Sequence, residues 1–106
     1  MDYHKSVVKY MNVIQYTTST NGNIIANNTQ QDLIVLHNAT ALAAVLTFTL
    51  PTTPVNGQIV TFSTKNGITL FTLAGGTLIT TISTLLSGSY VTWVYSLDAS
   101  SWFRIR

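Results

Sequence analysis

The stretch 45–62 limits the fold most strongly, because it combines two strand patterns with a connection that suits neither helix nor strand. Its first part, 45–50, alternates Val and Thr with Leu and Phe, the period-2 pattern of a half-buried strand. Pro51 ends that strand, since proline has no N–H to give to a ladder. Asn56-Gly57 tolerates positive φ and predicts a turn, after which 58–62 resumes the alternation. The stretch therefore predicts strand, turn and strand.

Similar patterns recur along the chain, separated by residues typical of turns. Only 39–44 has helix propensity, and this stretch is too short to form a helix alone. Short strands with frequent turn residues are typical of antiparallel folds. The sequence therefore predicts an all-β class, a small antiparallel β-sandwich or jelly-roll-like domain of about nine short strands. The predicted strands are 10–17, 24–26, 32–38, 45–50, 58–62, 68–73, 77–82, 90–97 and 102–106.

The chain of 106 residues is long enough for one domain with a modest core. We expect 1–9 to be a flexible N-terminal arm or a linker to a stem, because it carries Asp2, Lys5 and Lys9 without a strand pattern. Residues 10–106 would then form a single β domain. The chain has no cysteine, which excludes disulfides and zinc–thiolate sites.

Charge is unusually scarce. Asp, Glu, Lys and Arg make up 8% of the residues, against about 25% in ordinary domains. Two explanations are consistent with this: the surface is covered by neutral polar side chains, and part of it is buried against other copies of the chain. We expect both to hold, and the second predicts an oligomer. The net charge of +2 rests on scattered residues, so we predict no nucleic-acid binding. The spans 33–64 and 66–97 carry no charge, but Asn, Pro and Gly interrupt them and their alternation has a period of 2, so we predict no membrane-spanning helix and no membrane insertion.

Few residues could carry out chemistry, and none forms a recognisable constellation. The acids are Asp2, Asp32 and Asp98, and the histidines are His4 and His37. Asp32 and Asp98 stand at ordinary turn positions. His37 has no histidine or acidic residue at a metal-ligand spacing, although a trimer could bring three copies to an axis. We therefore predict no enzyme, no catalytic or metal-binding residue and no cofactor.

Two further features are candidates for binding. Gly75-Gly76 predicts a tight turn, since the lysine and helix of a phosphate loop are absent. Aromatic side chains with a polar tip occur at interfaces and on sugar-binding faces. In 90–97, Trp93 and Tyr95 share the more apolar face, which favours the core or a subunit interface and leaves a carbohydrate role as the alternative. The aromatic candidates are Tyr10, Tyr16, Tyr90, Trp93, Tyr95 and Trp102.

The residues from 41 to 106 resemble a known family. A Thr-rich strand ends in Leu50-Pro51 and is followed by Pro54-x-x-Gly57-Gln58. An Asn-Gly turn, a Ser-Gly-Ser turn, an aromatic strand and a closing Trp102 come next, in that order. This order is similar to that of the C-terminal head domains of phage tail fibres and viral fibre or collagen-like proteins. The turn at 87–89 is shorter than in the family pattern.

The resemblance implies a homotrimeric viral fibre-head (spike) domain, exposed on the virion surface. Its expected function is attachment to the host surface through a glycan or protein receptor, with avidity from three sites. No receptor-binding residues can be carried over. Two alternatives stay open: a structural cap that trimerises and registers a fibrous stem without touching a receptor, and a carbohydrate-binding module.

Overall fold

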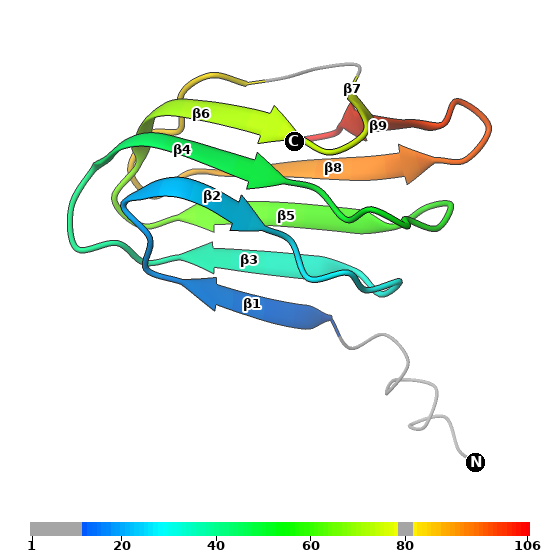
Figure 1. Cartoon of the computed structure of the whole chain (residues 1–106), viewed down its shortest axis with the longest axis horizontal. Coiled ribbons are helices and arrows are strands. Elements are labelled where there is room, and N and C mark those ends of the chain that lie inside the picture. The colour runs from blue at the N-terminus through cyan, green and yellow to red at the C-terminus, as the bar shows by residue number, and fades with distance from the viewer. Residues whose placement is uncertain (1–11, 79–81) are drawn as a thin grey trace, which may run out of the picture.

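The computed structural model describes residues 12–78 and 82–106, so the predicted arm 1–9 lies outside the described part. The described residues form nine strands and no helix, in agreement with the predicted class and strand number (Figure 1). The described residues thus include no helix that could cross a membrane. The strands are β1 (Val13–Thr17), β2 (Asn21–Ile25), β3 (Leu33–His37), β4 (Ala43–Thr49), β5 (Ile59–Thr64), β6 (Ile68–Ala74), β7 (Thr77–Leu78), β8 (Tyr90–Ser96) and β9 (Ser101–Arg104).

The strands form two sheets that face one another across the core. Sheet A has the order β1-β3-β5-β8-β9-β7, and sheet B has the order β2-β4-β6. In Figure 1 the strands of sheet B lie in front of those of sheet A. From β1 to β6 the chain alternates between the sheets, and β1, β3 and β5 run parallel, as do β2, β4 and β6. Each pair of strands is therefore one coil of a β-solenoid of about four turns.

This arrangement overturns the predicted antiparallel sandwich or jelly roll. Among the described strands, only β8 pairs antiparallel with its neighbours, β5 and β9. The alternation of side chains is the same in parallel and antiparallel strands, so it predicts strands but not their pairing. The error came from interpreting turn residues as hairpins, whereas most of them carry the chain from one sheet to the other.

The Asn-Gly dipeptides illustrate this difference. Asn21-Gly22 lies between the predicted strands 10–17 and 24–26, but it opens β2, where Gly22 has a φ of +90°. Asn66-Gly67 lies at the corner between β5 in sheet A and β6 in sheet B. Asn56-Gly57 precedes β5, and the preceding strand β4 belongs to the other sheet. A residue that permits positive φ thus suits a corner between two sheets as well as a hairpin, so it does not predict antiparallel pairing.

The core lies between the sheets and is filled by the inward side chains of successive coils. The phenyl ring of Phe62 is its centre, with ring centroids 5.0 Å from Phe48 and 4.9 Å from Phe71. Phe48 also stacks on the indole of Trp93, which is fully buried. Trp93 therefore belongs to the core, one of the two places predicted for it. Since Phe48 and Phe71 come from sheet B and Phe62 and Trp93 from sheet A, these contacts join the two sheets.

Glycine at position 67 is required by close packing as well as by its backbone conformation. A Cβ there would lie 3.0 Å from the Leu85 oxygen and from the Ser87 nitrogen, with φ at +89°. Gly22 has nearly the same φ, +90°, but a Cβ would meet nothing within 4 Å. We expect Gly22→Ala to cost about 1–2 kcal/mol in free energy of unfolding from backbone strain. Gly67→Ala should cost at least about 1 kcal/mol more because of the clash.

Urea denaturation of the two variants beside the parent protein measures both costs. Equal losses at the two positions would show that the corner between β5 and β6 is not packed as described.

Candidate functional site

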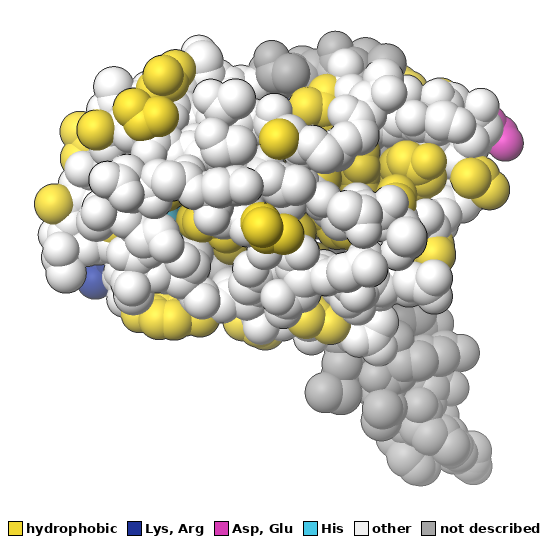
Figure 2. Space-filling view, in the orientation of Figure 1, with side chains coloured by type: hydrophobic (Ala, Val, Ile, Leu, Met, Phe, Trp, Pro, Cys, Tyr) yellow, Lys and Arg dark blue, Asp and Glu magenta, His cyan; other side chains and the backbone are white. Residues whose placement is uncertain are grey.

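The charged side chains of the described chain avoid the outer faces of the sheets. Asp32 and Lys65 lie directly before and after strands, and Asp98 lies in the β8–β9 hairpin. Arg104 and Arg106 are exposed at the last strand and the residues after it. Figure 2, which looks from the side of sheet B, shows charged side chains only near the margins of the molecule. Both sheets thus present uncharged outer faces.

The outer face of sheet A is the more apolar of the two. Register places its outward side chains in rows that cross four strands, and one row contains Tyr16, Leu36, Ser63 and Tyr90. The next row contains two isoleucines and two threonines, Ile14, Ile34, Thr61 and Thr92. Tyr16 is 60% exposed, Ile14 54% and Tyr90 51%. A contiguous apolar surface of this kind is typical of an interaction site.

The outer face of sheet B has a different character. Its rows are Asn21–Val45–Leu70 and Asn23–Thr47–Thr72, followed by Ile25, Thr49 and Ala74. The hydroxyl of Thr49 donates to the Asn23 side-chain oxygen over 2.9 Å. This face is therefore neutral and mixes exposed apolar side chains, Ile25 and the adjacent Val45 and Leu70, with hydroxyls and amides. Among the described strands, outward aromatic rings occur on sheet A and not on sheet B.

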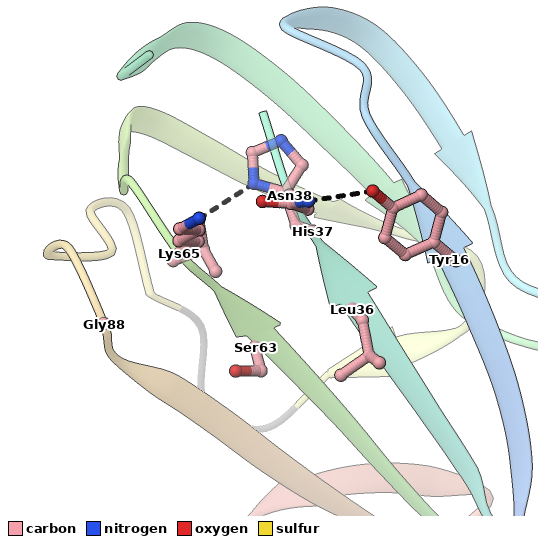
Figure 3. A pocket seen from close by; sticks show the side chains of 8 residues that line it. Tyr16, Leu36, His37, Asn38, Ser63, Lys65 and Gly88 are labelled. Atoms are coloured by element: carbon pink, nitrogen blue, oxygen red, sulfur yellow. Dashed lines mark hydrogen bonds between the residues drawn. The ribbon is translucent and has the colours of Figure 1, made fainter. Parts of the chain in front are cut away.

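One end of the outer face of sheet A is hollow (Figure 3). The hollow has a volume of about 380 Å³ and is lined by Tyr16, Leu36 and Ser63 from the sheet and by Asn38 and Lys65 from the corners. The Asn38 amide donates to the Tyr16 hydroxyl over 2.8 Å, which fixes the aromatic ring at the edge of the hollow. The hollow can therefore hold a side chain of another molecule, which would contact an aromatic ring, an aliphatic side chain and a single cation.

His37 lies beneath this hollow and holds three coils together. Its Nε2 donates to the Ser19 carbonyl over 2.7 Å, because a carbonyl can only accept. The Thr64 hydroxyl lies 2.8 Å from Nδ1 and also accepts the Gly67 N–H over 3.1 Å. All acceptors are satisfied when the Thr64 hydroxyl donates to Nδ1. Since both ring nitrogens are used and only 1% of His37 is exposed, the imidazole is not placed to act as a base.

Neither acidic residue of the described chain is part of a catalytic arrangement: Asp32 makes a structural hydrogen bond, and Asp98 is exposed. The Asp32 carboxylate accepts the Ile59 N–H over 2.9 Å and so joins the start of β3 to the start of β5. Asp98 is exposed in the hairpin turn where the sequence placed it. No three acidic or histidine side chains of the described chain lie close enough together to hold a metal ion. Asp2, His4 and Tyr10 lie outside the described residues.

The sequence analysis missed two glutamines that join the loops of the coils. The Gln58 amide donates to the carbonyls of Thr29 and Gln31, both over 2.8 Å, and its oxygen accepts the Val55 N–H. In the first coil, the Gln15 amide bridges the Ile25 carbonyl and the Asn27 N–H. Gln58 follows Gly57 at the start of a strand, a position that could have suggested a buried structural role.

Comparisons with models of protein families, with curated proteins and with solved structures found no match for this chain. The geometry of its surfaces is therefore the basis for any functional proposal.

The link between His37 and Thr64 can be tested by removing one hydroxyl. Thr64→Val would leave the Nδ1 atom of His37 and the Gly67 N–H buried without a partner. We expect a loss of about 2–4 kcal/mol in free energy of unfolding, since each orphaned group costs about 1–3 kcal/mol. The same substitution at the exposed Thr72 should change stability by less than about 0.5 kcal/mol. Chemical denaturation measures both, and similar losses would contradict a special role for Thr64.

Proposed function

We propose that this protein is the head domain of a trimeric viral fibre, in which the outer face of sheet A packs against other copies of the chain. The observation that carries the proposal is the contiguous apolar and uncharged surface on that face. The resemblance of 41–106 to fibre-head domains supports the same assembly and adds the virion surface as its location. Attachment to a host surface is the role that such a projecting domain would serve.

The size of the face supports an interface between copies. Six strands about 4.8 Å apart, mostly four to seven residues long at about 3.3 Å per residue, give a flat outline on the order of 500 Å². Side chains that stand out from the sheet raise the accessible area above this outline. A standard interface buries about 800 Å² on each partner. One such face is therefore of the right order to hold a subunit in place.

The chemistry of the face also favours another copy over a charged partner. Charged residues are depleted at the centre of interfaces, and aromatic residues are enriched there. Tyr16 and Tyr90 lie in the same row and are half exposed, so each can enter a hollow of a neighbouring subunit. The hollow bounded by Asn38 and Lys65 is a suitable receptor for such a ring. A ring of three subunits uses two different patches on each copy, which one broad face can supply.

The oligomeric mass tests this proposal directly. We expect sedimentation equilibrium or light scattering to give three times the mass of the chain at micromolar concentration. Leu36→Asp would place three carboxylates in the apolar interface and should yield a monomer that remains folded, because Leu36 is 39% exposed in the single chain.

Val45→Asp is the matched control, since Val45 is 48% exposed on the outer face of sheet B. This variant should remain a trimer. A parent protein that is monomeric, or a trimer that dissociates with Val45→Asp and not with Leu36→Asp, would overturn the proposal.

A further inference from the structure

A second hollow lies at the opposite end of the strands, away from the outer face of sheet A. It has a volume of about 280 Å³ and lies between three loops. Pro51, Thr52 and Pro54 come from the β4–β5 connection, and Gly76 comes from the turn before β7. The β8–β9 hairpin adds aromatic and hydroxyl side chains. Loops that converge on a rigid scaffold are a common place for binding sites.

An aromatic pair lies behind one wall of this loop-end hollow; Trp102 is 1% exposed, so the half-buried Tyr95 presents the accessible ring. Tyr95 and Trp102 are cross-strand partners on β8 and β9, with ring centroids 5.2 Å apart and ring planes tilted by 58°. Gly76 lies against the edge of the indole, because a Cβ there would be 3.5 Å from Cδ1 and 3.6 Å from Nε1 of Trp102. A larger residue at 76 would therefore cover this edge. The half-buried Pro54 adds further apolar surface beside Tyr95.

The polar side-chain groups of the loop-end hollow are hydroxyls and the indole N–H of Trp102, and none of the described residues that line it is charged. The Thr52 hydroxyl donates to the Asn28 side-chain oxygen, and the Ser100 hydroxyl donates to the Leu97 carbonyl. These contacts, 3.3 and 3.4 Å, are long for hydroxyl hydrogen bonds, so both oxygens can also interact with a ligand. A ligand for this site should thus be neutral and carry hydroxyl groups.

The hollow is also held in shape by its backbone. Ser100 has a φ of 51°, the single left-handed residue other than glycine in the described chain. A Cβ at Gly75 would lie 3.0 Å from the Leu50 oxygen and from the Thr49 side chain, so glycine permits the turn to pack directly on the end of β4. A site whose walls are fixed in advance loses less entropy when a ligand binds.

We propose that the loop-end hollow binds one ring of a neutral saccharide. The apolar face of a sugar ring can lie on an aromatic side chain, and its hydroxyls can donate to Thr52 and Ser100. The volume of about 280 Å³ lies just below the range of about 300–1,000 Å³ typical of ligand pockets, which suits one ring better than an extended peptide. This proposal deepens the attachment role and rests on it, because a glycan on a host surface would be the natural source of such a ring.

The saccharide site and the proposed trimer interface use different sides of sheet A. Tyr95 alternates with Val94 and Ser96 on β8 and faces the same side as the buried Trp93. The loop-end hollow therefore opens on the inner side of the sheet, and the apolar outer face is free to pack against other copies. The trimer can therefore be tested by its mass and the saccharide site by sugar binding, and either proposal can be refuted without the other.

The test is an NMR titration of the full chain with glucose, galactose, mannose and N-acetylglucosamine, each raised to tens of millimolar. We expect at least one of these sugars to shift the indole N–H signal of Trp102 and the amide signals of Gly76 and Ser100. The signals of Tyr16 and Leu36 should not move. Glucuronate should bind more weakly than glucose, since no cation lines the loop-end hollow.

Two variants locate the effect. Tyr95→Ala should weaken binding about tenfold by removing part of the aromatic wall. Because Tyr95 also packs on the core, Thr52→Tyr is the second variant: Thr52 is exposed, and a large side chain there should fill the hollow without loss of stability. Thr72→Tyr, an equal change at an exposed position on sheet B, should leave binding unchanged.

Signal shifts that are confined to the β4–β5 connection, the turn before β7 and the β8–β9 hairpin, and that Thr52→Tyr abolishes, would support the saccharide site. The absence of shifts with all four sugars would overturn it, as would shifts that persist in Thr52→Tyr. A proline-rich peptide that shifts the same signals when no sugar does would also overturn it, in favour of a peptide site. A folded trimer without sugar binding would refute this inference and leave the proposed assembly standing.

Discussion

The solenoid depends on hydrogen bonds that pass from the corner of one coil to the next. Each coil turns its backbone sharply at its two edges, and the polar groups exposed by these turns need partners inside the stack. His37 meets this need at one edge by linking the Ser19 carbonyl in the first coil to Thr64 in the third. Gln58 does the same at the other edge with the carbonyls of Thr29 and Gln31. Two buried polar side chains thus fix the spacing on which the parallel ladders depend.

The sequence contained the strands but not the way in which they stack. Alternation placed Leu46, Phe48 and Leu50 inside, and all three are fully buried. The coils could not be recognised as repeats, because Val13 lies beside Leu33 and Leu33 beside Val60, so that one coil takes 20 residues and the next 27. An array with unequal loops leaves no fixed period in the sequence. The antiparallel prediction failed for this reason, not through misplacement of the strands.

The surfaces were predictable only in part. Scarcity of charge indicated that some surface is neutral, and the few charges do lie outside the sheet faces. Which face is apolar depends on the parallel register, which brings Tyr16 beside Leu36 from strands twenty residues apart. The pairing of Tyr95 with Trp102 was easier to predict from the sequence, because a short hairpin joins their strands. Long-range register is set by the whole stack, and no local pattern encodes it.

The reversed direction of β8 closes one end of the solenoid. A parallel coil leaves an edge that can accept another coil, whereas β8 runs antiparallel to β5 and continues into the β8–β9 hairpin. Sheet B is closed at the same end, since Ile68 exchanges two backbone hydrogen bonds with Leu85 and the Phe71 N–H donates to the Ser83 carbonyl. The clash that excludes a side chain at Gly67 arises from this same closing segment. Termination of the stack at this end therefore accounts for both the antiparallel strand and the glycine.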